Sequence, residues 1–209
     1  MIKLLVADDH AIVRKGIEQI IAETTDIVVS DEARNGQEVM AKAAKNVYDL
    51  VLLDIAMPGR DGLEVLKELK KQRPKLAVLM LSMYPEEQYA IRALRSGASG
   101  YLTKESAPDE LIAAIRKVSS GGKYISSSLA EKIVHKMGHD ADTPIHEQLS
   151  DREYEIFIKL ASGKTLTEIA DELALSVKTI STYRARLLVK MNMRSNAEIT
   201  KYAIENKLV

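Results

Sequence analysis

The sequence predicts an α/β domain built on a doubly wound, five-stranded parallel sheet, followed by an all-α domain of four helices. Three observations lead to this prediction. Short apolar segments alternate with helical patterns over roughly the first 120 residues, which is typical of α/β folds. Some of these segments, such as Leu50–Leu53, are almost continuously apolar, as strands buried on both faces are. Beyond about residue 121 only helical patterns remain.

Five strands and five helices are predicted in the first part. The strands are Lys3–Ala7, Ile27–Ser30, Leu50–Leu53, Val78–Leu81 and Gly100–Leu102. The helices cover about residues 11–24, 36–45, 62–72, 86–96 and 108–120. Gly16 lies inside the first helix and weakens that prediction slightly, because glycine disfavours a helix interior.

A polar stretch without strands separates the two parts. Ser126, Ser127 and Ser128 can cap a short helix over about residues 128–137, and Gly138–Pro144 has the polar composition of a linker. We therefore divide the chain into a first domain at 1–122, a linker with a short helix at 123–147, and a second domain at 148–209.

Four helices are predicted in the last part, at about residues 151–161, 166–173, 177–191 and 196–206. Three of them begin at a capping box, in which a hydroxyl accepts a hydrogen bond from the third helical amide and a glutamate accepts one from the cap amide. The boxes are Ser150/Glu153, Thr165/Glu168 and Ser195/Glu198. Ser176 begins the remaining helix without a glutamate, and Gly163 is a suitable stop for the first.

Composition narrows the possible functions. The hydrophobic fraction of 46% and the charged fraction of 29% are those of a globular protein. Thirty basic and thirty acidic residues balance, so a charged partner must bind a local patch. No cysteine is present, which excludes disulfides and thiolate metal sites. No apolar run suits a signal peptide or approaches the about 20 residues of a membrane span, so we expect a cytoplasmic protein without a membrane partner.

Polar side chains follow four of the predicted strands. Asp8 and Asp9 follow the first strand, Asp54 the third, Ser82 the fourth, and Lys104 the fifth. Ligands of open α/β sheets bind beyond the carboxyl ends of the strands, so these groups should converge. Crowded carboxylates repel one another unless a cation lies among them, and a hard, oxygen-liganded ion such as Mg²⁺ suits them.

Each of these residues also has an ordinary structural explanation. Asp8 and Asp9 can simply cap the following helix, Ser82 can be a loop serine, and Lys104 can be a solvated lysine. The joint placement at successive strand ends is what favours a functional site.

The acidic cluster resembles the site of a two-component response regulator receiver domain. The resemblance rests on Asp8-Asp9-His10, on the stretch Asp54–Gly62, on Ser82, and on Tyr101–Lys104, and it covers residues 1 to about 120. It implies a flavodoxin-like receiver fold, in which Asp54 accepts a phosphoryl group from a phosphohistidine of a sensor histidine kinase.

The resemblance also implies a role for each neighbour of Asp54. Asp9, Asp54 and the Ala56 carbonyl would hold Mg²⁺ directly, and Asp8 would act through a water. Lys104 and Ser82 would contact the phosphoryl oxygens. Tyr101 would be the aromatic switch, whose ring turns inward when Ser82 moves, although a half-buried strand tyrosine is the ordinary alternative. These roles agree with phosphoryl transfer, which needs positioning and charge stabilisation.

Two positions depart from the usual receiver pattern. Glu105 follows Lys104, where the family usually has a proline, often with a cis bond; a cis bond before another residue costs about 3–4 kcal/mol. Ala56 gives a small apolar side chain two residues after Asp54, a position that can tune access of water to an acyl phosphate.

Basic residues gather near the C-terminal end of the chain. No acidic residue occurs between Glu172 and Glu198, whereas this span contains Lys178, Arg184, Arg186, Lys190 and Arg194. Segregated positive charge is the footprint of a protein that binds a phosphate backbone, although a solvated cationic helix face has the same composition. A short helix, a tight turn and a basic second helix predict a helix-turn-helix.

Three segments resemble a LuxR-type helix-turn-helix: Leu149–Ile156, Gly163–Ala170 and Leu175–Arg184. Together with the receiver pattern, they make nearly the whole chain similar to a NarL/FixJ-type response regulator, in which phosphorylation controls DNA binding. The resemblance implies that one set of residues packs the motif: Ile169, Ala170, Val177, Thr179 and Ile180. It also implies that the helix at about 196–206 makes the contact of a homodimer on DNA; packing on the other helices is the plain alternative.

The basic helix should supply the contacts to double-stranded DNA. The expected phosphate contacts are Lys178, Thr179, Tyr183, Arg186 and Lys190. Ser181, Thr182 and Ala185 are candidates for contacts to base edges, and Arg184 suits either a guanine or a phosphate.

Two other functions compete with a regulator that is not itself an enzyme. A magnesium-dependent phosphatase or phosphotransferase would share the acidic cluster, but one common phosphatase class needs a second carboxylate where Ala56 stands. An interaction adaptor would use the second domain without binding DNA. The remaining histidines, His135, His139 and His146, match no metal motif and are expected to be exposed.

Overall fold

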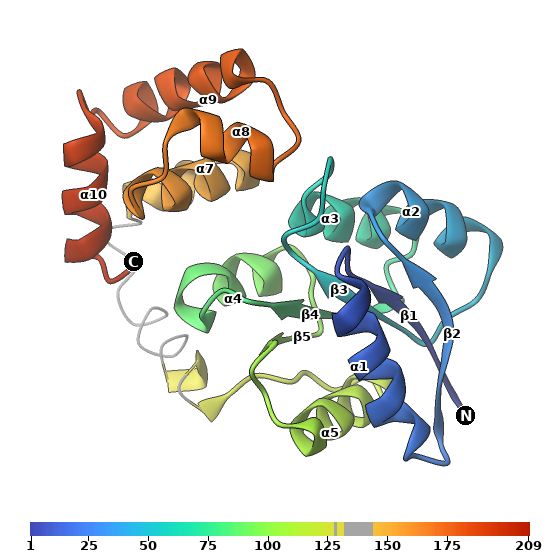
Figure 1. The fold of residues 1–209 in the computed structure, drawn as a ribbon. Coiled ribbons are helices and arrows are strands. Elements are labelled where there is room, and N and C mark those ends of the chain that lie inside the picture. The colour runs from blue at the N-terminus through green and yellow to red at the C-terminus, as the bar shows by residue number, and fades with distance from the viewer. Residues whose placement is uncertain (128, 132–143) are drawn as a thin grey trace. The chain divides into compact units, whose positions relative to one another are not determined.

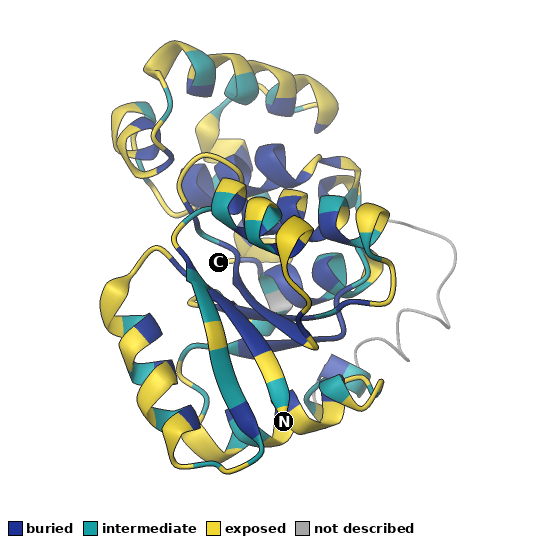
Figure 2. Ribbon diagram, turned by 90° about the vertical axis from the view of Figure 1, so that its right-hand side faces the viewer, coloured by how far each residue is buried: buried dark blue, intermediate teal, exposed yellow. Residues whose placement is uncertain are grey.

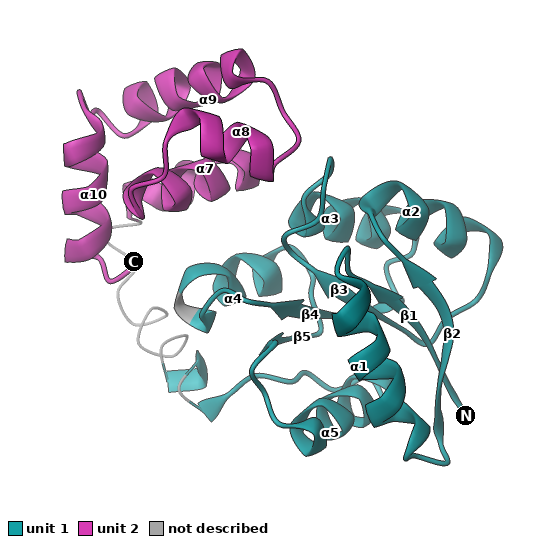
Figure 3. Cartoon of the chain, viewed as in Figure 1, with its two compact units in different colours: residues 1–133 teal, residues 134–209 magenta. Residues whose placement is uncertain are grey.

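The structure is a computed structural model that describes residues 1–127, 129–131 and 144–209, with Glu87 described by its backbone alone. The chain divides into two compact units, residues 1–133 and residues 134–209 (Figure 3). No helix among the described residues is long and apolar enough to cross a membrane.

The first unit is the predicted parallel five-stranded sheet, in the order β2-β1-β3-β4-β5 (Figure 1). Its strands are β1 (Ile2–Ala7), β2 (Ile27–Ala33), β3 (Leu50–Asp54), β4 (Ala77–Ser82) and β5 (Gly100–Thr103). Its helices are α1 (Ala11–Ala22), α2 (Gly36–Lys45), α3 (Gly62–Gln72), α4 (Glu86–Arg95) and α5 (Pro108–Ser119). The fold class and the element order predicted from the sequence are confirmed.

Helices cover both faces of this sheet, which explains the continuous apolar strands. Helices α1 and α5 cover one face, where Ile17 and Ile115 join Leu4, Leu52 and Leu79 in one buried cluster. Helices α2, α3 and α4 lie on the other face (Figure 1). All five residues of β3 are buried, and the helices keep their exposed residues on the outer side (Figure 2).

The predicted end of β2 is too early by three residues. The strand continues through Asp31, Glu32 and Ala33, because the polar pair Asp31 and Glu32 interrupted the apolar pattern on which the prediction rested. Strand β2 lies at the edge of the sheet, where polar side chains can reach solvent while the backbone still pairs with β1.

Two loops next to the strand ends have defined geometry. Gly62 begins α3 so close to β3 that a Cβ atom there would lie 2.1 Å from the Asp54 carbonyl oxygen. Asp61 caps α3 by accepting a hydrogen bond from the Leu63 amide at 2.5 Å. No described peptide bond is cis, so the bond from Lys104 to Glu105 is trans.

The chain leaves α5 through two glycines and returns to the free edge of β5. Tyr124 forms an isolated parallel bridge with Gly100 of that strand. The Ser126 hydroxyl oxygen accepts a hydrogen bond from the Leu129 amide, as a helix cap does. Most of the predicted short helix at 128–137, and the predicted linker up to residue 143, lie outside the described residues.

The second unit consists of a short 3₁₀ helix, η1 (Ile145–Gln148), and four α-helices among its described residues. The α-helices are α7 (Asp151–Ala161), α8 (Leu166–Glu172), α9 (Val177–Lys190) and α10 (Asn196–Glu205). Each lies within one residue of its predicted bounds. Gly163 follows α7 with a φ of +86°, the left-handed conformation expected after a helix end.

Two of the three predicted capping boxes are complete. Ser150 with Glu153 and Thr165 with Glu168 exchange both expected hydrogen bonds. The third prediction is wrong in one half, because the Glu198 carboxylate accepts from the Arg194 amide, one residue before the cap, instead of from Ser195.

Candidate functional site

The carboxyl edge of the sheet gathers the predicted polar residues. Asp8 follows β1, and its amide donates to the Ala33 carbonyl of β2 at 3.0 Å. Asp54 is the last residue of β3, Ser82 is the last residue of β4, and Lys104 follows β5. The parallel order places all four at the same edge of the sheet.

Lys104 lies between two buried carboxylates. Its ammonium nitrogen is 2.7 Å from Asp54 Oδ2 and 2.7 Å from Asp8 Oδ2. Both aspartates are 1% exposed, so these charges have little contact with water. One ammonium cannot balance two buried carboxylates and the adjacent Asp9, and the cluster therefore keeps an excess of negative charge.

The cluster fits a divalent, oxygen-liganded cation. Ligand atoms of Asp8, Asp9, His10 and Asp54 all lie within 4.8 Å of one another. Asp8 Oδ2 is buried and accepts no directed hydrogen bond from the described residues, although the Lys104 ammonium is close to it. Clustered carboxylates with spare acceptor capacity are the ligands that Mg²⁺ takes in proteins. Ala56, whose carbonyl is the other predicted ligand, lies beside Asp54 and donates its amide to Asp54 Oδ1 at 3.3 Å.

Burial and charge pull the titration of this cluster in opposite directions. Burial raises the pKa of Asp54 above its ordinary value; the Lys104 ammonium opposes this rise and Asp8 reinforces it. For Lys104, burial alone would lower the pKa, but the Asp54 and Asp8 carboxylates outweigh it and raise the pKa. Lys104 therefore carries a positive charge, whereas ionisation of Asp54 has a cost in desolvation.

Ser82 and Tyr101 are linked through the loop after β4. The Ser82 hydroxyl oxygen accepts a hydrogen bond from the Tyr84 amide at 3.1 Å, and the Tyr101 hydroxyl donates to the Tyr84 carbonyl at 2.8 Å. Both side chains are buried, and burial raises the pKa of Tyr101, so its hydroxyl stays protonated. The ring of Tyr101 thus points inward in this structure.

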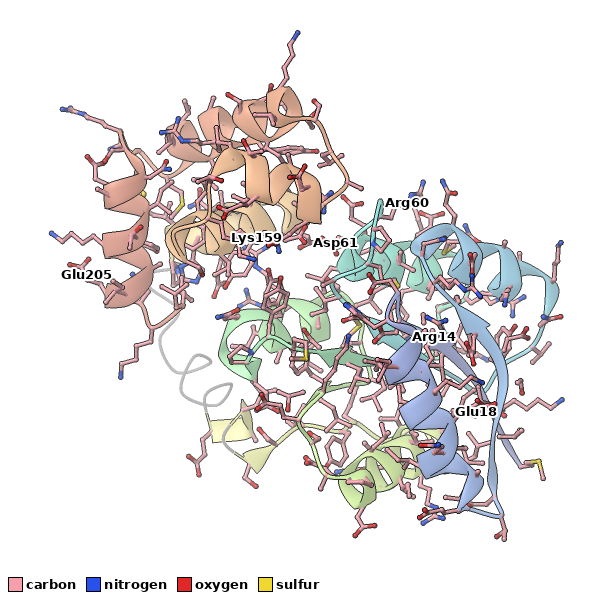
Figure 4. All side chains as sticks on the ribbon, in the orientation of Figure 1. Arg14, Glu18, Arg60, Asp61, Lys159 and Glu205 are labelled. Atoms are coloured by element: carbon pink, nitrogen blue, oxygen red, sulfur yellow. The ribbon has the colours of Figure 1, made fainter. Side chains whose placement is uncertain are left out.

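Arg14 of α1 is part of this edge and was not singled out in the sequence. It is 5% exposed; its guanidinium donates to the Asp8 carbonyl at 2.8 Å and to Glu32 at 2.7 Å (Figure 4). A signal was present, since Arg14 shares the spacing of the buried Ile17 and Ile21 on one helix face. His10, expected as a helix-start residue, is the N-cap of α1, and its Nδ1 lies 2.9 Å from Asp9 Oδ1.

The second unit contains the predicted helix-turn-helix. Helix α8 ends at Glu172, and the turn passes through Ala174, whose φ of +51° reverses the chain without a glycine. Ser176 then caps α9 by accepting a hydrogen bond from the Thr179 amide at 3.0 Å. On α9, Ile180 and Leu187 face the core.

The predicted DNA contacts lie on the remaining surface of α9. The exposed ones are Lys178, Ser181, Thr182, Ala185, Arg186 and Lys190, and the partly exposed ones are Thr179, Tyr183 and Arg184. Two of the cations have partners within the unit: Arg184 Nε donates to Asn196 Oδ1 at 2.7 Å, and the Lys190 ammonium donates to Glu153 Oε2 at 2.6 Å. Among the described residues, the side chains of Lys178 and Arg186 have no hydrogen-bond or ion-pair partner.

Two further expectations for this unit are wrong. Val177 was expected in the core but is 44% exposed, because it is the first residue of α9 and lies at the end of the packed layer that Ile180 and Leu187 fill. His146 was expected to be exposed but is buried, and its Nδ1 lies 3.0 Å from the Tyr202 hydroxyl oxygen. His135 and His139 lie outside the described residues.

Comparisons with protein families and characterised proteins agree with both units. The response regulator receiver domain model matches residues 4–116, and the model of bacterial regulatory proteins of the luxR family matches residues 147–203. The chain is 34% identical to the response regulator UvrY of Escherichia coli K12, over all of this chain and 96% of UvrY. It is 36% identical to the oxygen regulatory protein NreC of Staphylococcus carnosus, over 99% of each chain.

Solved structures give the same result. RcsB of Salmonella enterica serovar Typhimurium, bound to the rprA promoter in the presence of the phosphomimetic BeF3-, matches with a TM-score of 0.66 and 26% identity, over 97% of this chain and 98% of RcsB. A LuxR-family response regulator from Aurantimonas matches 66% of this chain with a TM-score of 0.61 and 29% identity, over 98% of its own length. The chain belongs to the NarL/FixJ family of response regulators and is a phosphorylation-controlled, DNA-binding regulator of transcription, not an enzyme in the usual sense.

Proposed function

We propose that Asp54 is the residue that is phosphorylated, and that a sensor histidine kinase supplies the phosphoryl group. A carboxylate oxygen of Asp54 attacks the phosphorus, the phosphorus–nitrogen bond of the kinase phosphohistidine breaks, and an acyl phosphate forms on Asp54. The observation that carries the proposal is the position of the Lys104 ammonium, 2.7 Å from the Asp54 carboxylate at the open edge of the sheet. The receiver domain match supports the kinase as partner.

The other residues of the edge have distinct roles in this proposal. Asp8, Asp9, Asp54 and the Ala56 carbonyl would hold Mg²⁺, directly or, for Asp8, through a water. When bound, this ion supplies positive charge for the phosphoryl oxygens. Lys104 supplies a second positive charge, and Ser82 donates its hydroxyl to a phosphoryl oxygen. Tyr101 responds to the movement of Ser82.

Phosphate incorporation tests this assignment directly. The full chain is treated with acetyl phosphate and Mg²⁺, and the labelled residue is located by mass spectrometry. Asp54→Asn keeps the shape of the side chain but removes the nucleophile, so label in the first unit should disappear. Asp49→Asn, on the opposite end of β3, is the control and should label like the unmodified chain. Label that persists in Asp54→Asn contradicts the assignment.

We also propose how α9 binds double-stranded DNA. The structures of RcsB on promoter DNA and of two RcsB dimers on two parallel DNAs support a homodimer that places one α9 on each half-site. Phosphate contacts come from Lys178, Thr179, Tyr183, Arg186 and Lys190, base contacts from Ser181, Thr182 and Ala185, and Arg184 serves either. Because the proposed partner of the second unit is DNA, we infer that the protein acts in the cytoplasm.

The salt dependence of DNA affinity distinguishes the roles of the basic side chains of α9. A phosphate contact contributes about 0.9 to the slope of log affinity against log salt concentration. Arg186→Ala should reduce the slope by about one and weaken all DNA sequences alike. Lys190→Ala is the matched comparison and should reduce the slope by less than Arg186→Ala, because the Glu153 carboxylate already neutralises part of the charge of that phosphate contact. A loss of affinity in Arg186→Ala that is confined to one base position would make Arg186 a base reader instead.

A further inference from the structure

We propose that Tyr124 is a further positioning residue of the phosphorylation switch, acting through Tyr101. We propose also that the stretch Lys123–Ser126, called the exit segment below, carries the state of the switch out of the first unit. The inference rests on the proposed function of Asp54, Ser82 and Tyr101. Its own evidence is the set of contacts that the exit segment makes with β5, with α5, with the first residue of α4 and with the loop that follows α4.

The backbone of Tyr124 holds the backbone of Tyr101. The Tyr124 amide donates to the Ser99 carbonyl at 2.9 Å, and the Tyr101 amide donates to the Tyr124 carbonyl at 3.3 Å. These bonds add the exit segment to the free edge of β5, the last strand of the sheet. The residue that carries the switch ring is therefore hydrogen-bonded directly to the segment by which the chain leaves the first unit.

Gly100 makes this close approach possible. A Cβ atom at residue 100 would lie 2.6 Å from the Tyr124 carbonyl oxygen and 3.0 Å from the Tyr124 Cβ. Any larger residue at this position would force the exit segment away from β5. The structure thus explains why residue 100 is a glycine, which a sequence pattern alone does not explain.

Side chains attach the exit segment to its surroundings. The Tyr124 hydroxyl donates to Glu110 Oε1 at 3.1 Å, and the Lys117 ammonium lies 5.7 Å from the centre of the Tyr124 ring, both on α5. The Lys123 ammonium donates to the Ala98 carbonyl, just after α4, at 2.6 Å. At the other end of α4, the Ser126 hydroxyl donates to the carboxylate of Glu86, the first residue of the helix.

Two routes connect Ser82 to the exit segment. In the first, the Ser82 hydroxyl oxygen accepts from the Tyr84 amide, and Glu86, which binds Ser126, follows two residues later. In the second, the Tyr84 carbonyl accepts from the Tyr101 hydroxyl, and the Tyr101 amide is bonded to Tyr124. A Ser82 hydroxyl that turns toward a phosphoryl group releases the Tyr84 amide and disturbs both routes.

The exit segment also begins the next structural element. Ser126 uses the same hydroxyl oxygen to accept from the Leu129 amide, so the residue that contacts α4 also caps the turn that follows. A change at Glu86 therefore reaches the chain on its way to the second unit. If the exit segment only covered the edge of β5, its loss would lower stability without altering the response to phosphate.

The experiment uses the full chain, acetyl phosphate with Mg²⁺, and a DNA duplex selected from random sequence by the phosphorylated protein. For each variant, phosphate incorporation at Asp54 and DNA affinity with and without acetyl phosphate are measured at fixed salt. Ser126→Ala removes the contact with Glu86, and Gly100→Ala displaces Tyr124. Ser127→Ala, an exposed neighbour, is the control.

We expect all three variants to incorporate phosphate within about twofold of the unmodified chain. The ratio of the two DNA affinities should fall by about fivefold or more in Ser126→Ala and Gly100→Ala, toward one, because coupling between sites is commonly worth about 5- to 150-fold. Ser127→Ala should keep the ratio. In the unmodified chain, phosphorylation should also change the hydrogen exchange of residues 123–127.

If Ser126→Ala leaves the ratio of DNA affinities with and without acetyl phosphate unchanged, the proposal is overturned. This variant removes only one hydroxyl, so the test remains valid even if Gly100→Ala does not fold. If phosphorylation of Asp54 leaves the DNA affinity of the unmodified chain unchanged, the proposal is overturned as well. Absence of phosphate from Asp54 in the unmodified chain is a separate result, which refutes the proposed function and the inference with it.

Discussion

At the scale of single residues, the acidic edge is a compromise between binding and stability. Asp8 and Asp54 are buried with one ammonium between them, so the carboxylates are in place before any cation or phosphoryl group arrives. Their placement at strand ends made them predictable from sequence. Arg14 was not predictable in the same way, because its contacts with Asp8 and Glu32 depend on how α1 packs beside β2.

Neutralising Asp54 should stabilise the protein when no divalent cation is present. The pKa of Asp54 is higher in the folded state than its ordinary value of 3.8, so ionised Asp54 destabilises the fold at any pH above 3.8. This loss of folding free energy is present at pH 7. We expect Asp54→Asn to raise the melting temperature in EDTA by about 4 °C or more, as roughly 1 kcal/mol does in a small domain. Asp9→Asn, at a more exposed position, should have a smaller effect.

Scanning calorimetry with and without Mg²⁺ checks this prediction. Added Mg²⁺ should stabilise the unmodified chain, because it binds the folded state, and it should stabilise Asp54→Asn less. A melting temperature in EDTA that falls in Asp54→Asn contradicts the charge argument.

Glu153 should make the second unit sensitive to acid. Burial opposes its ionisation, but hydrogen bonds from Lys190 and Ser150 outweigh burial and lower the pKa of Glu153 below its ordinary value of 4.5. A lowered folded pKa gives stability that is present above pH 4.5 and is lost as the pH falls through the folded pKa. Glu153→Gln should therefore cost about 1–3 kcal/mol at pH 7 and progressively less below pH 4.5.

Calorimetric melting of the second unit at pH 7, 5 and 4 measures this difference. Glu205→Gln is the control, because Glu205 is exposed and pairs only loosely with Lys201 at 3.8 Å, so its effect should be near zero at each pH. A gap between Glu153→Gln and the unmodified chain that widens in acid would show that the sign is wrong.

At the scale of elements, most bounds followed from local patterns. Periodicity and caps placed the bounds of α1 to α5 and of α7 to α10 within two residues, since helix ends depend on neighbouring residues. Strand β2 was harder, because the polar residues Asp31 and Glu32 interrupt its apolar pattern while the backbone still pairs with β1 at the sheet edge. The hydrogen bond that the Arg194 amide donates to Glu198, and the addition of Tyr124 to β5, depend on exact backbone geometry that a spacing rule does not contain.

Two glycines of the first unit should respond to alanine with opposite signs. Gly16 lies inside α1 with nothing within 4 Å of an added Cβ, so Gly16→Ala should stabilise the protein by about 0.5–1 kcal/mol through helix propensity. At Gly62, an added Cβ would lie 2.1 Å from the Asp54 carbonyl oxygen, and β3 or α3 must move. We expect Gly62→Ala to lower the free energy of unfolding by more than about 2 kcal/mol.

Urea denaturation of both variants, monitored by circular dichroism, tests the pair. Phosphate incorporation at Asp54 should stay normal in Gly16→Ala and fall in Gly62→Ala, because the clash lies on the Asp54 backbone. Equal stability of the two variants would refute the role given to Gly62.

At the scale of the whole molecule, phosphorylation and DNA binding belong to different units. The proposed phosphorylation site is confined to residues 8–104 and the predicted DNA contacts to residues 178–190, so a signal must pass through the chain between them. The sequence predicted both units because each has its own motifs and its own core. It could not predict the path between them, because that path consists of contacts such as Ser126 with Glu86, forty residues apart.

The second unit alone should bind DNA without a phosphoryl group. It has its own buried core, with Phe157, Ile169, Ile180, Leu187 and Ile199 at 0% exposure, so a fragment of residues 144–209 should fold. We expect the unphosphorylated receiver to restrain α9 or its dimer surface, and a phosphoryl group to favour a conformer that lifts this restraint, because it binds that conformer more tightly.

Titration of one duplex at fixed salt compares the fragment with the full chain, with and without acetyl phosphate. The fragment should bind in both conditions and the full chain only with acetyl phosphate. Arg186→Ala in the fragment is the control for binding through α9. Equal affinity of the fragment and of both forms of the full chain would show that the receiver does not restrain the DNA-binding unit.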